Sequence, residues 1–198
     1  LGSDPVGYKD FAGATVVLPG TFGHEEALSL IEAHVVTGLL GVPTQLKTLD
    51  GIRKRADDPF DTDSLRYIRT GGAIVTATLV EETHEHLGDR LYNTYGMTEA
   101  GPDLTFAHPS AQTNHPGTIG KEAFSWELRV VESVGLSETP DPDATVDAGE
   151  RREIIPRGPG MATGYIDNDE ADAKRFFAGW PRTRAVARVA SAGCLSAV

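Results

Sequence analysis

Cysteine is almost absent from this sequence. The single Cys194 cannot form an internal disulfide, and its neighbours offer no CxxC or metal-ligand spacing, so nothing indicates an oxidising compartment. No hydrophobic run approaches the roughly 18 residues of a membrane-spanning helix. The chain starts at Leu1 with no initiator methionine, basic segment or apolar signal segment. We therefore expect a cytoplasmic protein without a membrane span, and we expect that an N-terminal portion is missing.

Positive charge is scarce. The 198 residues contain 18 Lys and Arg against 29 Asp and Glu, which gives a formal net charge of -11, and only five of the basic residues are lysine. An acidic surplus of this kind opposes attraction to phosphate backbones and anionic lipid, so nucleic acid is not an expected partner. A content of 39% hydrophobic and 24% charged residues is typical of soluble globular proteins with their own core.

The first part of the chain alternates apolar runs with amphipathic stretches, which predicts parallel strands joined by helices. Turn-forming residues separate these stretches, and Thr44 is available to cap the second helix. We expect strands at residues 14–18, 38–42, 65–68 and 91–94, and helices at residues 24–35, around 44–52, and 76–86.

The rhythm changes after residue 96. Residues 101–117 are rich in Pro, His, Asn and Thr and predict a loop, and residues 137–149 predict another. Strands are expected at residues 125–131 and 153–157, with Pro156 at an edge or bulge, and a helix within residues 167–177. The fold class is therefore α/β: a parallel, helix-flanked sheet over residues 1–115, followed by a smaller β-rich subdomain with one helix over residues 116–198.

The most informative segment runs from Asn93 to Glu99, with the sequence NTYGMTE, where the fourth expected strand leaves the sheet. Ligands of open α/β sheets bind beyond the carboxyl ends of the strands. An aromatic ring, a glycine, a hydroxyl and a carboxylate arrive there together, which suits a purine, a phosphate and a divalent cation. Taken alone, the segment fits an ordinary strand and polar turn equally well.

Consecutive blocks of the chain resemble the adenylate-forming superfamily of acyl-CoA synthetases, aryl-acid ligases and peptide-synthetase adenylation domains. The blocks follow the family's order within its large N-terminal domain: AGATVVLPGTF, EEALSLIEAHVVTGLLGVPT, TGGA, YGMTEAG, HPGTIGK, RGPG and TGYIDNDEADAKRFFAGW. YGMTE followed at the right separation by GWxRT is a specific combination.

The resemblance implies roles for individual residues. Tyr95 would stack on adenine, Thr98 would hydrogen-bond the α-phosphate, and Glu99 would hold Mg²⁺, which makes Thr98 and Glu99 the catalytic candidates. The remaining nucleotide-binding candidates line the pocket: Gly71, Gly72, Ala73, Asn93, Thr94, Gly96 and Met97. The implied reaction joins a small-molecule carboxylic acid to the thiol of coenzyme A, with ATP consumed to AMP, and the family's range includes fatty acid metabolism.

Two departures from the family pattern bear on activity. No Gly-, Ser- and Thr-rich phosphate loop is found, and the C-terminal domain with the family's catalytic Lys would lie beyond Val198. Where the family has Arg-Thr-Gly-Asp, with an Asp that accepts the ribose hydroxyls, this chain has Arg184 and Ala185 after Thr183. A methyl group accepts no hydrogen bond. We therefore expect the isolated chain to be inactive.

Other readings stay open alongside the partial ligase. The chain is also consistent with a noncatalytic nucleotide-binding or interaction module, or with an aryl-acid or peptide-synthetase adenylation domain. The acid, the thiol acceptor and the oligomeric state are not specified by the sequence. His84 and His86 suggest metal only weakly, because side chains two apart on a helix diverge, and we expect them on a solvated face. His108 and His115 are expected to be loop histidines, and Cys194 to be a bystander.

Overall fold

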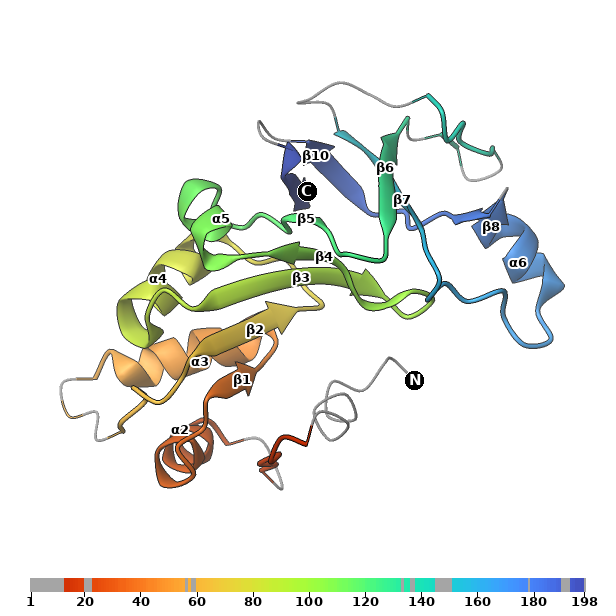
Figure 1. Cartoon of the computed structure of the whole chain (residues 1–198). Coiled ribbons are helices and arrows are strands. Elements are labelled where there is room, and N and C mark those ends of the chain that lie inside the picture. The colour runs from red at the N-terminus through yellow and green to blue at the C-terminus, as the bar shows by residue number, and fades with distance from the viewer. Residues whose placement is uncertain are drawn as a thin grey trace. The chain divides into compact units, whose positions relative to one another are not determined.

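The computed structural model describes residues 13–19, 23–55, 57, 60–132, 134–135, 138–144, 151–177, 179–189 and 193–197. The chain divides into two compact units. Unit 1 comprises residues 1–94 and 107–117, and unit 2 comprises residues 95–106 and 118–198. Each unit is described by itself below, and both are drawn in Figure 1.

Unit 1 contains the parallel part of a five-stranded sheet ordered β1-β2-β3-β4-β5. Strand β1 pairs with β2 in parallel, and β2 pairs in parallel with β3. The strands alternate with helices, as the sequence predicts for successive crossovers. The bounds are α2 His24–Ala33, β1 Gly38–Leu40, α3 Pro43–Arg53, β2 Tyr67–Gly71, α4 Ala77–Leu87, β3 Leu91–Met97 and α5 Pro109–Asn114.

One hydrophobic core holds these elements together. Apolar residues from α2, α3 and α4 meet residues from β2 and β3, and the fully buried members include Leu28, Leu46, Leu49, Ile68 and Leu91. The helices contribute one apolar stripe each, at the spacing that an amphipathic helix requires. Figure 1 shows α3 and α4 beside the strands that they connect.

Helix boundaries follow local capping chemistry. The expected helix at residues 76–86 is confirmed as α4, and the Thr76 hydroxyl caps it by accepting a hydrogen bond from the backbone N–H of Leu79 at 3.2 Å. The expected cap at Thr44 is wrong. Helix α3 starts at Pro43, whose fixed φ suits the first helical position, and the Gln45 side chain accepts from the N–H of Val42 at 3.0 Å.

The expected buried strand at residues 14–18 is wrong. Residues 13–19 have no regular secondary structure, and Leu18 is 69% exposed. The described residues provide no strand that pairs with this segment, and an apolar run without ladder partners forms no strand.

The expected loop at residues 101–117 is also wrong. It contains strand β4, Gly101–Ala107, and helix α5, Pro109–Asn114. Strand β4 begins with Gly, Pro and Asp, residues that favour turns. Its later residues Leu104, Thr105 and Ala107 are buried. The His108 side chain caps α5 by accepting from the N–H of Ser110.

Unit 2 is built mainly from antiparallel strands. It contains most of β4, which pairs with β5, a four-stranded sheet ordered β11-β10-β7-β6, and a two-stranded sheet of β8 and β9. Its core includes Ile119, Ile154, Ala187 and Leu195. The bounds are β5 Lys121–Glu122, β6 Glu127–Val131, β7 Arg151–Arg157, α6 Asp169–Arg175, β8 Phe176–Phe177, β9 Trp180–Pro181, β10 Val186–Val189 and β11 Leu195–Ala197.

Pro156 lies in β7, which is an inner strand of this sheet, so the expected edge strand is wrong. Its position explains how the sheet tolerates it. Strand β10 pairs with β7 only at residues 151–153, whereas Pro156 pairs with Leu128 of β6 on the other side. Beyond the β10 ladder, the missing N–H of proline removes no hydrogen bond from that side.

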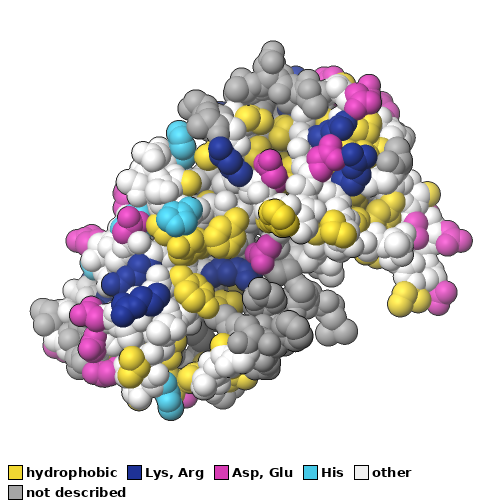
Figure 2. All heavy atoms as spheres, in the orientation of Figure 1, with side chains coloured by type: hydrophobic (Ala, Val, Ile, Leu, Met, Phe, Trp, Pro, Cys, Tyr) yellow, Lys and Arg dark blue, Asp and Glu magenta, His cyan; other side chains and the backbone are white. Residues whose placement is uncertain are grey.

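The surface of unit 2 carries ion pairs over β6 and β7. Glu127 accepts from Arg157 at 2.5 Å and from Arg129 at 3.0 Å, and both guanidinium groups lie over the Trp180 ring. Figure 2 shows basic and acidic side chains next to one another on this face. The α/β fold class is confirmed, and no helix among the described residues is long and apolar enough to cross a membrane.

Candidate functional site

The candidate segment is a strand that ends in a turn. Asn93 to Met97 belong to β3, and Thr98 and Glu99 form the turn that follows, so the strand extends three residues beyond the expected end. Asn93 and Thr94 are buried, Tyr95, Gly96 and Met97 are half-buried, and Thr98 is exposed. The turn therefore presents the Thr98 hydroxyl to solvent.

Within unit 1, Gly71 lies opposite Thr94 in the parallel register of β2 and β3. A Cβ atom at Gly71 would come within 2.5 Å of the Thr94 carbonyl oxygen and 2.8 Å of its hydroxyl. Only glycine allows this approach. The chain then bends at Gly72, whose φ of +77° is in the left-handed region, and Gly72 and Ala73 are exposed. The strand end thus leaves backbone accessible.

Within unit 2, Tyr95 packs against the hydrophobic core that contains Ile119 and Ile154. Burial raises the pKa of its hydroxyl above the usual value of 10, although a hydrogen bond with Thr183 opposes the rise. The Thr183 hydroxyl donates to the Ile154 carbonyl at 2.6 Å and accepts from the N–H of Ala185 at 2.9 Å. The Thr183 side chain is thereby fixed beside the Tyr95 hydroxyl, and the ring of Tyr95 is held at that end.

Glu99 is held by residues far away in the sequence. Its Oε1 accepts a hydrogen bond from the Tyr165 hydroxyl and another from Arg175 Nη2 at 3.2 Å. Its backbone carbonyl accepts from the N–H of Ala162 at 2.7 Å. Burial alone would raise the pKa of Glu99, but the hydrogen bonds from Tyr165 and its own N–H, together with Arg175, lower the pKa below 4.5. The carboxylate is ionised at neutral pH.

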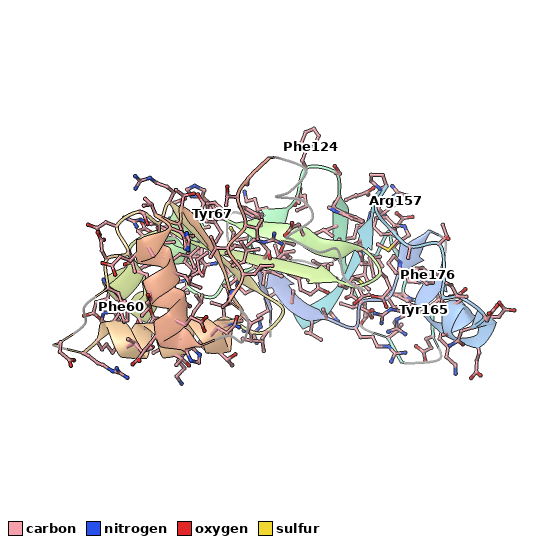
Figure 3. The ribbon with its side chains drawn as sticks, turned by 90° about the horizontal axis from the view of Figure 1, so that it is seen from below. Phe60, Tyr67, Phe124, Arg157, Tyr165 and Phe176 are labelled. Carbon is pink, nitrogen blue, oxygen red and sulfur yellow. The ribbon has the colours of Figure 1, made fainter. Side chains whose placement is uncertain are left out.

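Tyr165 reaches Glu99 because α6 fixes its backbone and ring. The N–H of Tyr165 donates to Asp172 Oδ1 at 2.7 Å, and its ring lies 5.8 Å from the ring of Phe176. A Cβ atom at Gly164 would approach Asp172 Oδ2 to 2.5 Å, so a larger residue there would push the Asp172 carboxylate out of its position. Figure 3 shows Tyr165 and Phe176 close together beside α6.

A buried ion pair anchors the arginine of the GWxRT block. Arg182 and Glu153 side chains are 5% and 2% exposed, and their closest atoms are 2.8 Å apart. The Arg182 guanidinium also donates to the carbonyls of Val134, Gly135 and Glu138 at 2.9–3.1 Å. Because the remaining donors are satisfied, the charge can be buried. The arginine of the GWxRT block is structural.

Arg184 and Ala185, which differ from the family pattern after Thr183, have different backbone environments. Arg184 has a φ of +58°, which favours glycine, the residue that the family pattern has there, and its N–H donates to Glu153 Oε1 at 2.9 Å. Ala185 is half-buried and its N–H is bound by Thr183. The turn at residue 184 therefore has a backbone conformation that glycine adopts more readily than arginine.

The described residues contain no group of three or more His, Cys, Asp or Glu side chains that could hold a metal ion. His84 and His86 lie on α4 with side chains 22% and 14% exposed, so the expected solvated face is wrong. His108 is the cap of α5 and contacts Tyr92, a structural role. Cys194 is buried.

Sequence reasoning missed the partners of the candidate residues. Tyr165 lies in a block that the resemblance covers, so that block could have drawn attention to it, but no local signal links it to Glu99. Arg175 is one of several charged residues in a short helix, and nothing in its neighbourhood distinguishes it. The Tyr95 to Thr183 bond likewise joins two motifs that were recognised separately.

The chain belongs to the AMP-binding enzyme family, whose model matches residues 11–166. It is 33% identical over 172 residues to indoleacetate–CoA ligase of Aromatoleum aromaticum, with 87% of this chain and 32% of that protein covered. It is 32% identical over 177 residues to feruloyl-CoA synthase of an Amycolatopsis species, with 89% and 34% covered. The chain spans about a third of the length of the curated relatives it matches.

Solved structures give the same result for the fold. A double mutant of o-succinylbenzoate CoA synthetase from Bacillus subtilis, bound with a product analogue, matches with a TM-score of 0.82 and 27% identity, covering 96% of this chain and 36% of that chain. The amide bond synthetase McbA from Marinactinospora thermotolerans matches with a TM-score of 0.81 and 26% identity, covering 93% and 36%.

Proposed function

We propose that the chain is part of an AMP-forming acid–CoA ligase and contributes residues that bind the nucleotide. The observation that carries the proposal is the turn after β3, where a core-anchored Tyr95, an exposed Thr98 hydroxyl and an ionised Glu99 follow one another. The reaction joins a carboxylate oxygen to the α-phosphorus of ATP as pyrophosphate leaves. The sulfur of coenzyme A then takes the acyl group, and AMP leaves.

The substrate carboxylate and the phosphates of ATP are both negatively charged, so the protein must position them and neutralise part of their charge in the first step. Tyr95 would stack on adenine, since its hydroxyl is fixed by Thr183 and the ring keeps its orientation. Thr98 would donate to the α-phosphate. The backbone of Gly71, Gly72 and Ala73 would contact the nucleoside, and Asn93, Thr94, Gly96 and Met97 would form the adjoining wall.

Glu99 would hold Mg²⁺, which neutralises phosphate charge when it is bound. A structure of o-succinylbenzoate CoA synthetase similar to this chain contains ATP and magnesium ion. Glu99 provides one ionised carboxylate whose side chain is 13% exposed. This fits Mg²⁺, which commonly binds one or two carboxylates while phosphate oxygens and water complete its coordination shell. The remaining ligands would come from the nucleotide and from solvent.

For the substrate we propose a carboxylic acid that carries a ring. The relatives include ligases of indoleacetate, ferulate and 2-succinylbenzoate, each of which is aromatic. A further relative from Mycobacterium tuberculosis, 34% identical, is a ligase of an acid with a saturated two-ring system. Together these relatives favour a ring-bearing acid over a fatty acid. We also propose that the protein works in the cytoplasm without nucleic acid, since its charge of -11 opposes binding to phosphate backbones.

Calorimetry with AMP tests the nucleotide site. The Tyr95→Ala variant should weaken AMP binding about tenfold or more, because loss of ring stacking costs roughly 1–3 kcal/mol. The Tyr95→Phe variant is the matched control: it keeps the ring and loses only the Thr183 bond, so its AMP affinity should stay within about threefold of the unmodified chain. Equal AMP binding by all three proteins would contradict the proposal.

A second candidate is a noncatalytic nucleotide-binding module. The observation that favours it is Ala185, whose methyl group offers no acceptor where the family pattern has a carboxylate. The two candidates differ in chemistry rather than in binding. Acid-dependent release of pyrophosphate from ATP supports the ligase, whereas AMP binding without any pyrophosphate release supports the module.

A further inference from the structure

We propose that Arg175 acts as an internal cation on Glu99 and competes with a divalent metal ion for this carboxylate. This inference rests on the proposed role of Glu99 and concerns how access to that carboxylate is controlled. The basis is geometric: the last residue of α6 places its guanidinium on the carboxylate that the turn after β3 presents. All residues involved belong to unit 2.

The contact is specific and partly shielded from solvent. Arg175 Nη2 lies 3.2 Å from Glu99 Oε1, and the two side chains are 21% and 13% exposed. The same oxygen accepts from the Tyr165 hydroxyl. The carboxylate oxygen thus carries one neutral and one charged donor, and an ion pair with this little solvent is screened less than a pair on the open surface.

Arg175 is held by its backbone more firmly than by its side chain. Its carbonyl accepts from the N–H of Arg182 at 2.7 Å, which fixes the end of α6. Its Nε is buried without a hydrogen-bond partner among the residues that the structure describes. The guanidinium therefore uses one of its possible donors on Glu99 and lacks the bidentate geometry of a strong arginine–carboxylate pair. It can leave Glu99 without dismantling a network.

A metal ion and Arg175 cannot share Glu99 without cost. Mg²⁺ binds a carboxylate oxygen at about 2.1 Å. Tyr165 and Arg175 both donate to Oε1, and a metal ion on Oε2 would still bring its double charge near a guanidinium that is 3.2 Å from the other oxygen of the same carboxylate. These like charges repel each other, so the Arg175 contact lowers the affinity of Glu99 for a metal ion.

The two methionines of the chain provide a local probe. Met97 lies two residues before Glu99, and Met161 precedes Ala162, whose N–H donates to the Glu99 carbonyl. The full chain is labelled with ¹³C in both methionine methyl groups and titrated with Mn²⁺ in the presence of ATP, whose phosphates supply the remaining ligands. Paramagnetic broadening of the two signals then reports metal near Glu99 rather than at the other acidic residues, and competition with Mg²⁺ should restore both signals.

The key variant is Arg175→Gln. Half-broadening should occur at Mn²⁺ concentrations about fivefold lower than in the unmodified chain, the effect expected from removing an ion pair of ordinary strength. Arg175→Lys keeps the charge and should stay within about twofold of the unmodified chain. Lys174→Gln is the matched control, since it removes the same charge one residue away from an exposed pair with Glu170, and it should also stay within twofold.

Three results would overturn the proposal. Arg175→Gln could bind Mn²⁺ no more tightly than the unmodified chain, Lys174→Gln could produce an equal gain, or Glu99→Gln could leave the broadening intact. Absence of broadening in every variant would also overturn it, because Glu99 would then not bind the ion. The nucleotide proposal is judged separately by AMP calorimetry on the Tyr95 variants, so the two can fail independently.

Discussion

Asp50 is an ionisable group buried at a cost to stability. It lies on α3 with 0% exposure, its Oδ2 accepts from the Thr83 hydroxyl at 3.0 Å, and its Oδ1 has no hydrogen-bond partner among the described residues. Burial raises its pKa from 3.8 to about 6, against smaller lowering effects from the Thr83 bond, His86 and Lys54. Replacing it with asparagine should therefore change the pH dependence of folding.

The sign follows from the raised pKa. Folding favours the protonated carboxyl, so this contribution to stability is fully present below pH 3.8 and is lost as the pH rises through about 6. At about 1.4 kcal/mol for each pH unit between the two pKa values, ionised Asp50 costs about 3 kcal/mol at pH 8. About half of that cost is removed by pH 5.

Urea unfolding at pH 8 and pH 5 measures the effect. The free energy of unfolding of Asp50→Asn minus that of the unmodified chain should be larger, meaning a relatively more stable variant, at pH 8 than at pH 5 by about 1.5 kcal/mol. The amide lowers both values equally where its new N–H groups lack acceptors, so the difference between the two pH values is the informative quantity. Asp63→Asn, an exposed aspartate of the same unit, is the control. An equal effect of Asp50→Asn at both pH values would refute the reasoning.

Three further substitutions test other parts of the structure. Val35, two residues after the end of α2, has a φ of +50° and is 67% exposed, so Val35→Gly should raise the free energy of unfolding by about 0.5–1 kcal/mol in a urea titration; a loss would show that the strain is absent. Arg182→Met leaves Glu153 buried without its partner and should destabilise unit 2 by about 3–5 kcal/mol by the same measurement. Ala185→Asp should strengthen AMP binding in calorimetry by about tenfold, the value of one hydrogen bond to a charged acceptor, and unchanged affinity would place the ribose elsewhere.

Local patterns predicted much of unit 1. The helix expected at residues 76–86 is confirmed as α4, because its signals lie in consecutive residues, among them Thr76, whose hydroxyl caps it. The strands were misplaced by two or three residues because their ends depend on pairing rather than on composition: β3 continues to Met97, past the predicted end at residue 94. Strand β4 was missed because its first residues favour turns, although later positions are buried.

The candidate site was predictable as a list of residues and not as a set of contacts. The NTYGMTE segment and the glycines of TGGA were found from sequence, and their assignment as nucleotide ligands stays a prediction. The partners of Glu99 could not be found in this way, because Tyr165 and Arg175 lie 66 and 76 residues further along the chain. Such pairs depend on how the end of α6 packs within unit 2, which no local pattern encodes.

Arg182 and Thr183 have a consequence for how such chains are recognised. The first neutralises a buried acid and ties down three loop carbonyls, and the second joins Tyr95 to the backbone of β7. Both sets of contacts stabilise unit 2 whether or not a nucleotide binds. A match to this dipeptide therefore reports inherited architecture, and surveys that seek working enzymes should weigh the two positions after it instead.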